Sequence, residues 1–241
     1  MSDNLDALGR ALPRLFDGLI ITLELSIGGA LLAFLIAVGL GLMAGLDNIV
    51  LRGIARTIIE FFRGTSLLVQ LFFLFFVLPL PPMNVELPAI VVGIVGLGLN
   101  YGAYGAEVVR GSIKSVPAGQ WEATTALSMS RAQRMWRIIF PQAWALMLPS
   151  LNNLLIQLIK GTAVVYLITI IDLTAVFNDL RQETRDVFFT YSLALVVYFA
   201  IAYAFSGLMT LLERRAKHRL GQKPRTTSSA VPDLKGASAG A

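Results

Sequence analysis

The sequence contains no cysteine, which excludes disulfide bonds and thiolate metal sites. Its single histidine, His218, lies in a polar stretch and has no neighbouring group with which to bind a metal or exchange a proton. No G-x-x-x-x-G-K-[ST] segment occurs, so a nucleotide would have to bind to another chain. We therefore expect no catalytic residue, no metal ion and no cofactor in this chain.

Charged residues are also scarce. They make up 15% of the 241 residues, against about 25% in soluble domains, whereas 56% of the residues are hydrophobic. One core of this size cannot bury so much apolar surface, so the chain requires lipid as part of its solvent. The net charge is +5, but the basic residues lie at the ends of apolar segments, which argues against nucleic acid as a partner.

Long apolar stretches are abundant. A helix of about 20 apolar residues crosses a membrane. Five stretches qualify, at residues 19–46, 58–80, 87–109, 146–170 and 188–212. The sequence therefore predicts an all-α, multi-pass membrane protein with about five transmembrane helices. Gly41 with Gly45, and Gly98 with Gly102, have the spacing that lets membrane helices approach closely.

The distribution of Lys and Arg predicts the orientation, because cytoplasmic loops carry an excess of both. With these spans, the basic residues of one side are Arg52, Arg56, Arg110, Lys114, Arg131, Arg134, Arg137, Arg214, Arg215, Lys217 and Arg219. The other side holds Arg10, Arg14, Arg181 and Arg185, among several acidic residues. We expect the N-terminus to lie outside the cytoplasm and the C-terminus inside it.

The two termini differ in character. Residues 1–17 should be extracytoplasmic, and apolar residues at helical spacing from Leu5 to Phe16 predict a short amphipathic helix on the outer surface. Residues 214–241 end in a run of small and polar residues that cannot offset the entropy of ordering. They predict a disordered cytoplasmic tail.

Residues 110–145 form the largest cytoplasmic connection. Pro117 can open a helix, with Ser115 near the capping position. The segment that follows is rich in small residues and carries Trp121 and Glu122. Small side chains let a helix enter a partner's groove, where an aromatic residue and a charge act as anchors.

A second helix of this connection should begin at Ser130. Its arginines alternate with apolar residues, including Met135 and Trp136, which suits the headgroup region of a membrane. Pro141 is expected to break this helix before the fourth span.

The connection contains a recognisable pattern. Glu122-Ala123-Thr124, Ser128, Ile138 and Pro141 fit EAA, three residues, Gly, nine residues, Ile, one residue, Leu-Pro. This spacing resembles the cytoplasmic signature of permease subunits in bacterial binding-protein-dependent ABC importers. Three positions depart from it, since Thr124 replaces Ala, Ser128 replaces Gly and Phe140 replaces Leu. Ser128 could alter the turn that glycine normally permits.

Other segments narrow the resemblance. Residues 63–70 read RGTSLLVQ and look like the family's RGTPLLVQ, with Ser66 in place of proline. Residues 102–104, 107, 110–111, 115–120 and 160–163 resemble the polar amino-acid branch, of histidine and glutamine type, although KGTA stands where KDTS is usual. The resemblance covers residues 18–213, nearly everything except the two termini.

The resemblance implies the ABC transmembrane type-1 importer fold, in a permease subunit of the bacterial inner membrane. It further implies a second permease subunit, identical or paralogous, an ATPase subunit that holds ATP and Mg²⁺, an extracytoplasmic solute-binding protein, and an amino-acid substrate. The ATPase-coupling residues would be Gln120, Trp121, Glu122, Ala123, Thr124, Ala126, Leu127 and Ser128.

Polar residues inside the expected spans need a reason, because a charge at mid-bilayer costs about 2.5–3.5 kcal/mol. Two polar stripes at helical spacing, with Thr162 beside the second, form a candidate substrate path. Its residues are Asn100, Tyr104, Glu107, Asn153, Gln157, Lys160 and Thr162. Lys160, near the middle of the fourth span, would bind the carboxylate of a zwitterion, and the Asn100 stripe its ammonium group. Alternatively, Lys160 and Glu107 form an ion pair, within the bundle or across the dimer, that only fixes the helix register.

Three other charged residues, Arg56, Glu60 and Arg63, share a helix face and are expected to pair with one another. Among other function classes, a secondary transporter of small polar solutes is the main alternative. It should show paired inverted repeats, which we do not find. A membrane enzyme lacks a nucleophile–base pair, and an ion channel lacks an evident filter.

Overall fold

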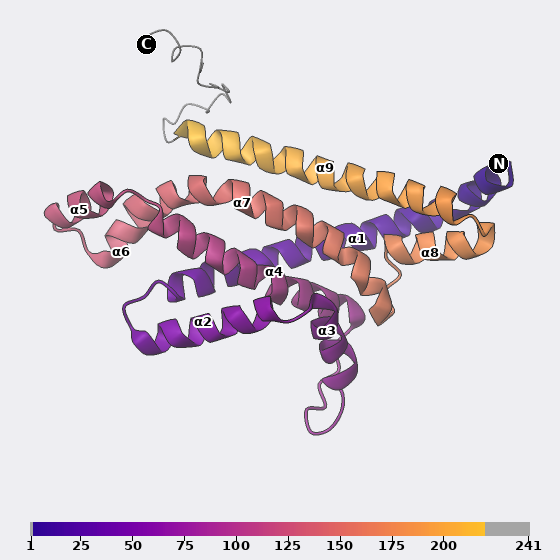
Figure 1. The fold of residues 1–241 in the computed structure, drawn as a ribbon, viewed down its shortest axis with the longest axis horizontal. Helices are drawn as coiled ribbons and strands as arrows, with labels where there is room; N and C mark the ends of the chain where they lie inside the picture. Colours follow the sequence, from indigo (N-terminus) through magenta and orange to yellow (C-terminus); the bar gives the residue numbers. More distant parts are fainter. Residues whose placement is uncertain (1, 220–241) are drawn as a thin grey trace, which may run out of the picture.

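The computed structural model describes residues 2–219, with side chains described for residues 4–215, and within this range every regular element is helical. In chain order (Figure 1) the elements are α1 (Ser2–Met43), α2 (Ile49–Gly64), α3 (Leu67–Phe72), the π-helical η1 (Phe73–Val77), α4 (Ala89–Lys114), α5 (Ala118–Ala126), α6 (Arg131–Arg134), the π-helical η2 (Met135–Ile139), α7 (Phe140–Gly161), the 3-10 helix η3 (Thr162–Ile168), α8 (Leu173–Thr184) and α9 (Val187–Arg219).

The number of spans agrees with the prediction. Within residues 2–219, four helical stretches are long and apolar enough to cross a membrane, and the bent pair α2–α3–η1 makes a fifth when counted as one span. Among these candidate spans α4 is the most deeply packed, since 56% of the residues in its most apolar stretch are buried. Helix α9 is the most peripheral, with 6% of such residues buried. The predicted all-α membrane fold is therefore confirmed, with α4 at its centre.

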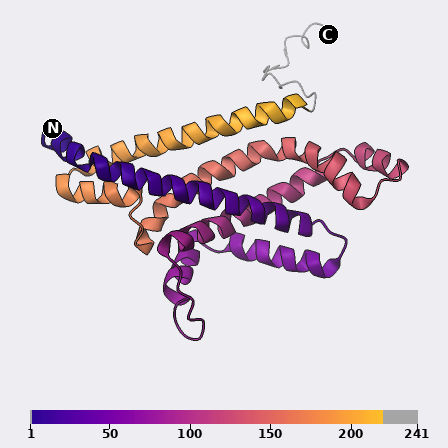
Figure 2. The ribbon, with the colours of Figure 1, turned by 180° about the vertical axis from the view of Figure 1, so that it is seen from behind.

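Helices α1 and α4 pack closely along much of their length, as both ribbon views show (Figures 1 and 2). A Cβ added at Gly98 would lie 2.6 Å from the side chain of Leu32, and one at Gly41 would lie 2.8 Å from the carbonyl oxygen of Ala106. Three of the four glycines singled out, Gly41, Gly98 and Gly102, thus lie in this contact, whereas Gly45 meets only its own helix.

The N-terminal segment differs from the expected separate surface helix, because α1 runs without interruption through Pro13 into the first span. Ala7 and Ala11 are buried against Phe177 of α8, and Arg10 pairs with Glu183 at 2.7 Å. The N-terminal part of α1 is therefore held by its contacts with α8.

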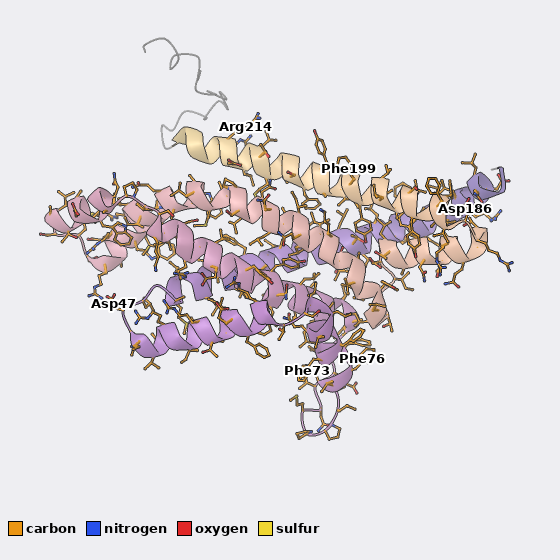
Figure 3. All side chains as sticks on the ribbon, viewed as in Figure 1. Asp47, Phe73, Phe76, Asp186, Phe199 and Arg214 are labelled. Atoms are coloured by element: carbon orange, nitrogen blue, oxygen red, sulfur yellow. The ribbon has the colours of Figure 1, made fainter. Side chains whose placement is uncertain are left out.

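The second expected span is not a straight helix. Between α2 and the α3–η1 unit the axis turns by 102°. Thr65 and Ser66, both with extended backbone, form the break. In Figure 1 the α3–η1 unit points away from the long axis of the molecule, and Figure 3 shows Phe73 and Phe76 on it. Both phenylalanines are exposed in the single chain.

Pro141 does not break the helix as expected. Elements α6, η2, α7 and η3 form one helical stretch, Arg131–Ile168. Proline has no N–H, and its ring would clash with a carbonyl four residues earlier. The wider π-helical turn of η2, in which Phe140 donates to the carbonyl of Met135, lies just before the proline and accommodates it. Lys160 lies in the last turn of α7, directly before η3.

The molecule has two distinct ends (Figure 3). One end carries α5, α6, the α1–α2 turn with Asp47, and Arg214 of α9; the other carries the N-terminus, α8 and Asp186. Helix α9 continues to Arg219, so residues 214–219 are helical where a disordered tail was expected. The rest of the expected tail, residues 220–241, lies outside the described residues.

Candidate functional site: the coupling helix and two polar stripes

Helix α5 follows a sharp turn after α4. Pro117 occupies its N-cap position with an extended backbone, and Ala118–Ala126 form the helix. Ser115 does not cap α5; it is the C-cap residue of α4, and its hydroxyl donates to the carbonyl of Gly111 at 2.9 Å. The turn therefore ends one helix and starts the next within three residues, which fixes their relative direction.

One face of α5 is anchored to the membrane helices. Trp121 packs on the cluster that includes Val116, Ile139 and Met147, and the side chain of Thr124 is buried. The Thr124 hydroxyl donates to the carbonyl of Trp121 at 2.8 Å. Any displacement of α5 would therefore be transmitted to η2 and α7 through packed side chains.

The opposite face of α5 is exposed. It carries most of the predicted coupling residues, namely Gln120, Glu122, Ala123, Ala126, Leu127 and Ser128. Leu127 is 74% exposed, and within residues 4–215 Glu122 makes no ion pair. Small residues flanked by one carboxylate and one exposed leucine form a surface suited to a groove in another protein.

The end of α5 depends on an unusual backbone conformation. Ser128 has φ 54°, in the left-handed region that favours glycine, so the serine adopts the turn that the resemblance assigns to glycine. Ser130 then caps α6, since its hydroxyl accepts from the N–H of Gln133 and the Gln133 side chain accepts from the N–H of Ser130. The turn after α5 is therefore kept, with local strain at Ser128.

In the α4 stripe, the side chain of Asn100 forms hydrogen bonds at the bend between α2 and α3. Its amide donates to the carbonyl of Phe62 at 3.2 Å and to Oε1 of Gln70 at 3.3 Å. The Gln70 amide donates to the same Phe62 carbonyl at 2.9 Å and to the Thr65 hydroxyl at 2.7 Å. Tyr104 donates to the carbonyl of Arg63 at 3.2 Å. These side chains satisfy carbonyls that the end of α2 leaves without helical partners.

The role of Gln70 was not predicted, although a polar residue inside an apolar run was the available signal. Its side chain is 8% exposed and connects the two halves of the bent span. Without Gln70 and Asn100, the Phe62 carbonyl would lack both of its side-chain donors in an apolar setting, a cost of about 1–3 kcal/mol.

Glu107 does not pair with Lys160. It binds Arg110 on its own helix, through contacts of 3.1 Å to Nε, and both side chains are about one-quarter exposed. Arg63 pairs with Glu60 at 3.1 Å, as expected, whereas Arg56 makes no ion pair within residues 4–215. The guanidinium carbon of Arg63 lies 5.5 Å from the centre of the Tyr104 ring. The idea of a Lys160–Glu107 ion pair within this chain is therefore wrong.

The second stripe lies exposed on α7. Asn153, Gln157 and Lys160 are all exposed, and within the described part of the chain no carboxylate lies within ion-pair distance of Lys160. Thr162 is buried, and its hydroxyl donates to the carbonyl of Ile159 at 2.7 Å. No side chain of the α4 stripe bonds to one of the α7 stripe in residues 4–215, so this chain does not join the two stripes by direct contact.

A buried acid at the other end of the molecule was also missed. Asp172 is fully buried at the N-cap of α8, where it accepts from the N–H of Ala175 at 3.0 Å and from the hydroxyl of Tyr198 at 3.3 Å. Burial raises the pKa of the Asp172 carboxyl, and these hydrogen bonds oppose the rise. Nothing in the local sequence distinguishes it from a solvated N-cap.

The comparisons with known proteins agree with this geometry. The family model for the binding-protein-dependent transport system inner membrane component matches residues 37–218. A probable amino-acid ABC transporter permease protein, y4tF of Sinorhizobium fredii, is 44% identical over 189 residues, covering 77% of this chain and 78% of the relative. The L-cystine transport system permease protein TcyB of Bacillus subtilis is 33% identical, covering 84% and 86%.

Solved structures share the fold. A crystal structure of an amino acid ABC transporter with histidines has a TM-score of 0.78 and 34% identity, covering 86% of this chain and 96% of that one. An inward-facing MetNI methionine ABC transporter has a TM-score of 0.72 at 17% identity, covering 84% and 96%, and supports the fold alone. The chain therefore belongs to the family of inner membrane components of binding-protein-dependent transport systems.

Proposed function

We propose that this chain is the permease subunit of an ATP-driven importer that carries polar or charged amino acids. Its ATP and Mg²⁺ would bind to a separate ATPase subunit that docks on α5. The single observation that carries the proposal is α5 itself, anchored on one side through Trp121 and exposed on the other at Glu122 and Leu127. Relatives named for amino-acid and L-cystine transport support the substrate class.

The same proposal includes the orientation of the chain in the membrane and its other partner subunits. The α5 end would face the cytoplasm, and the N-terminus and α8 would face outward, where a solute-binding protein delivers substrate. A second permease subunit, identical or paralogous, would complete the translocation unit. The excess of Lys and Arg on the α5 side supports this orientation.

The docking role of α5 can be tested with Glu122→Lys. Glu122 would meet a basic surface of the ATPase, so reversing its charge introduces repulsion. We expect the variant to lose copurification with the ATPase subunit and to lose ATP hydrolysis stimulated by the binding protein. Glu86→Lys is the matched control, because Glu86 is exposed in the loop between η1 and α4 and changes charge equally. Normal copurification of Glu122→Lys would contradict the proposed docking.

For the substrate, we propose that Lys160 binds the carboxylate of the amino acid. Its exposed position without a carboxylate partner within residues 4–215 supports this role. Neighbouring Asn153 and Gln157 would add hydrogen bonds. Lys160→Met should abolish uptake, and Lys160→Arg should retain part of it, both at normal expression. Unchanged uptake by Lys160→Met would remove Lys160 from the substrate path.

Fewer side chains are free to bind the ammonium group of the substrate than the sequence suggested. Glu107 is bound to Arg110, and Asn100 is buried in the α2–α3 bend, so neither side chain is free to bind a ligand as placed. Tyr104 is 37% exposed. We propose that Tyr104 contributes to the substrate path and that Asn100 acts indirectly, by holding the bend.

A further inference from the structure

A second feature lies behind the coupling helix, on the side that faces the membrane helices. A cavity of about 910 Å³ opens between the end of α1, the end of α4, α5 and the α6–η2 turn. Its lining includes four basic residues, Arg110, Lys114, Arg131 and Arg134, and two carboxylates, Asp47 and Glu122. The cavity therefore carries a positive excess within a single chain.

The positive charge is only partly neutralised. Arg131 pairs with Asp47 at 2.7 Å, and Arg110 pairs with Glu107. Glu122 makes no ion pair, and within residues 4–215 no carboxylate lies within ion-pair distance of Lys114 or Arg134. The Nε of Arg134 is moreover buried without a hydrogen-bond partner.

Cations that line a cavity without a carboxylate partner, as Lys114 and Arg134 do, are stabilised by an anionic ligand through charge-assisted hydrogen bonds. Arginine in particular matches the oxygens of carboxylate and phosphate groups, because its donors form a planar fork. The charge and hydrogen-bonding pattern of this cavity therefore favour an anion.

The position of the cavity indicates the source of that anion. It lies where the apolar sequence of α1 ends, and Trp136 on its rim is 56% exposed. Helix α2 begins two residues after Asp47 of the lining, and its first turns expose the apolar side chains of Ile49, Val50 and Ile54. Tryptophan and arginine together are typical of the headgroup level of a membrane, and basic pockets between membrane helices bind lipid headgroups.

We propose that this cavity binds the phosphate group of an anionic phospholipid, with Arg134 and Lys114 as its direct ligands. The acyl chains would lie along the exposed apolar residues of α2. The bound lipid would thus fill the space between α5 and the membrane helices and support α5 from behind. Leu127 and the exposed coupling residues of α5 other than Glu122 do not line the cavity and remain free for the ATPase, whereas Glu122 borders both surfaces.

The test uses the complete transporter in nanodiscs and measures binding of a fluorescent phosphatidylglycerol probe against a phosphatidylcholine background. Arg134→Gln and Lys114→Gln should each weaken binding about fivefold, since each cation near the membrane surface contributes about that factor. Arg137→Gln is the matched control, because Arg137 is exposed on the same helical stretch and does not line the cavity. The control should bind as the unmodified protein does.

Three results would overturn the proposal. Equal weakening by Arg137→Gln would mean that the lipid responds only to the overall surface charge. Protection of the unmodified protein from heat by inorganic phosphate, with no phosphatidylglycerol binding, would identify a soluble anion. Loss of ATPase copurification by Lys114→Gln, with lipid binding unchanged, would assign the cavity to the ATPase contact. Because Lys114 is exposed, this variant keeps the test valid if Arg134→Gln fails to fold.

Discussion

At the scale of single residues, Ser128 shows how a departure from a family pattern is tolerated. Its φ of 54° is the conformation that glycine adopts without steric cost, and a side chain there costs about 1–2 kcal/mol. The serine therefore keeps the geometry of the turn and lowers its stability. Thr124, the other small exchange in α5, is buried and internally hydrogen-bonded, so it fits without strain.

Ser128→Gly should consequently raise the stability of the protein by about 1 kcal/mol, because it removes the left-handed strain while retaining the turn. Thermal unfolding in detergent measures the change. Ser115→Gly is the control: Ser115 has φ −79°, so glycine relieves no strain there and loses a hydrogen bond to Gly111. A Ser128→Gly protein no more stable than Ser115→Gly would show that the turn is not strained.

Asp172 gives a prediction for pH dependence. Its pKa is raised by burial, so the folded protein binds this proton more tightly than the unfolded chain does. The stabilisation is therefore full below the carboxyl group's ordinary pKa and is lost as the pH rises through the higher pKa of the folded state. Asp172→Asn keeps an acceptor for the N–H of Ala175 but cannot titrate.

The measurement is the unfolding temperature of both proteins from about pH 4 to about pH 7. The unmodified protein should lose stability across this interval, and Asp172→Asn should lose less of it. Parallel curves for the two proteins would mean that other groups cause the pH dependence.

At the scale of elements, the contact between α1 and α4 holds the bundle together. Glycines on both helices bring the backbones near each other, so the contact tolerates no added atoms where the neighbour is backbone. The carbonyl oxygen of Ala106 lies 2.8 Å from a Cβ built on Gly41. A flexible side chain could move aside there, but a helical carbonyl cannot.

Gly41→Ala should therefore destabilise the protein by about 1–3 kcal/mol, the usual cost of overpacking. Gly39→Ala is a close control, since it lies on the same helix and a Cβ there meets nothing within 4 Å. Because alanine favours a helix more than glycine does, Gly39→Ala should leave stability unchanged or raise it. Thermal unfolding of the two variants decides the point, and equal shifts would contradict the close contact.

The bend between α2 and α3 is the element that sequence reasoning described least well. The apolar run 58–80 has the length of a straight span, and the local signal at the break is a single glycine, Gly64, directly before Thr65 and Ser66. Its stability depends on Asn100, which lies far along the chain from the Phe62 carbonyl that it binds. Local periodicity contains no information about such a partner.

At the scale of the whole molecule, both the family and the peripheral position of α9 indicate that the chain functions within lipid and beside other subunits. The exposed residues of α9, with Phe199 pointing outward in Figure 3, would be costly in water and are ordinary in a bilayer. Within residues 4–215, no side chain covers the exposed face of α5. Energy for transport would therefore enter from another protein.

Reconstitution into vesicles tests whether the permease can transport without an ATPase. Vesicles that contain only this permease, even with a substrate gradient and a proton gradient, should accumulate no amino acid. Addition of the ATPase subunit, ATP and the binding protein should produce uptake that stops when ATP is omitted. Uptake by the permease alone would contradict the proposal and would favour a secondary transporter.

The sequence by itself determined the membrane class, the approximate number of spans and the small-residue helix around Glu122. These properties reside in contiguous residues, where the length of an apolar run or a fixed spacing is sufficient evidence. The family comparison confirms the resemblance on which the type-1 importer fold was expected, because the family model spans residues 37–218.

Only the tertiary structure decided which polar groups meet. It paired Glu107 with Arg110 instead of Lys160, placed Asn100 in the α2–α3 bend, and packed the N-terminal turns on α8. Each choice depends on how helices far apart in sequence pack against one another. A buried polar group takes whichever partner that packing brings within reach, and the spacing of residues along one helix does not specify that partner.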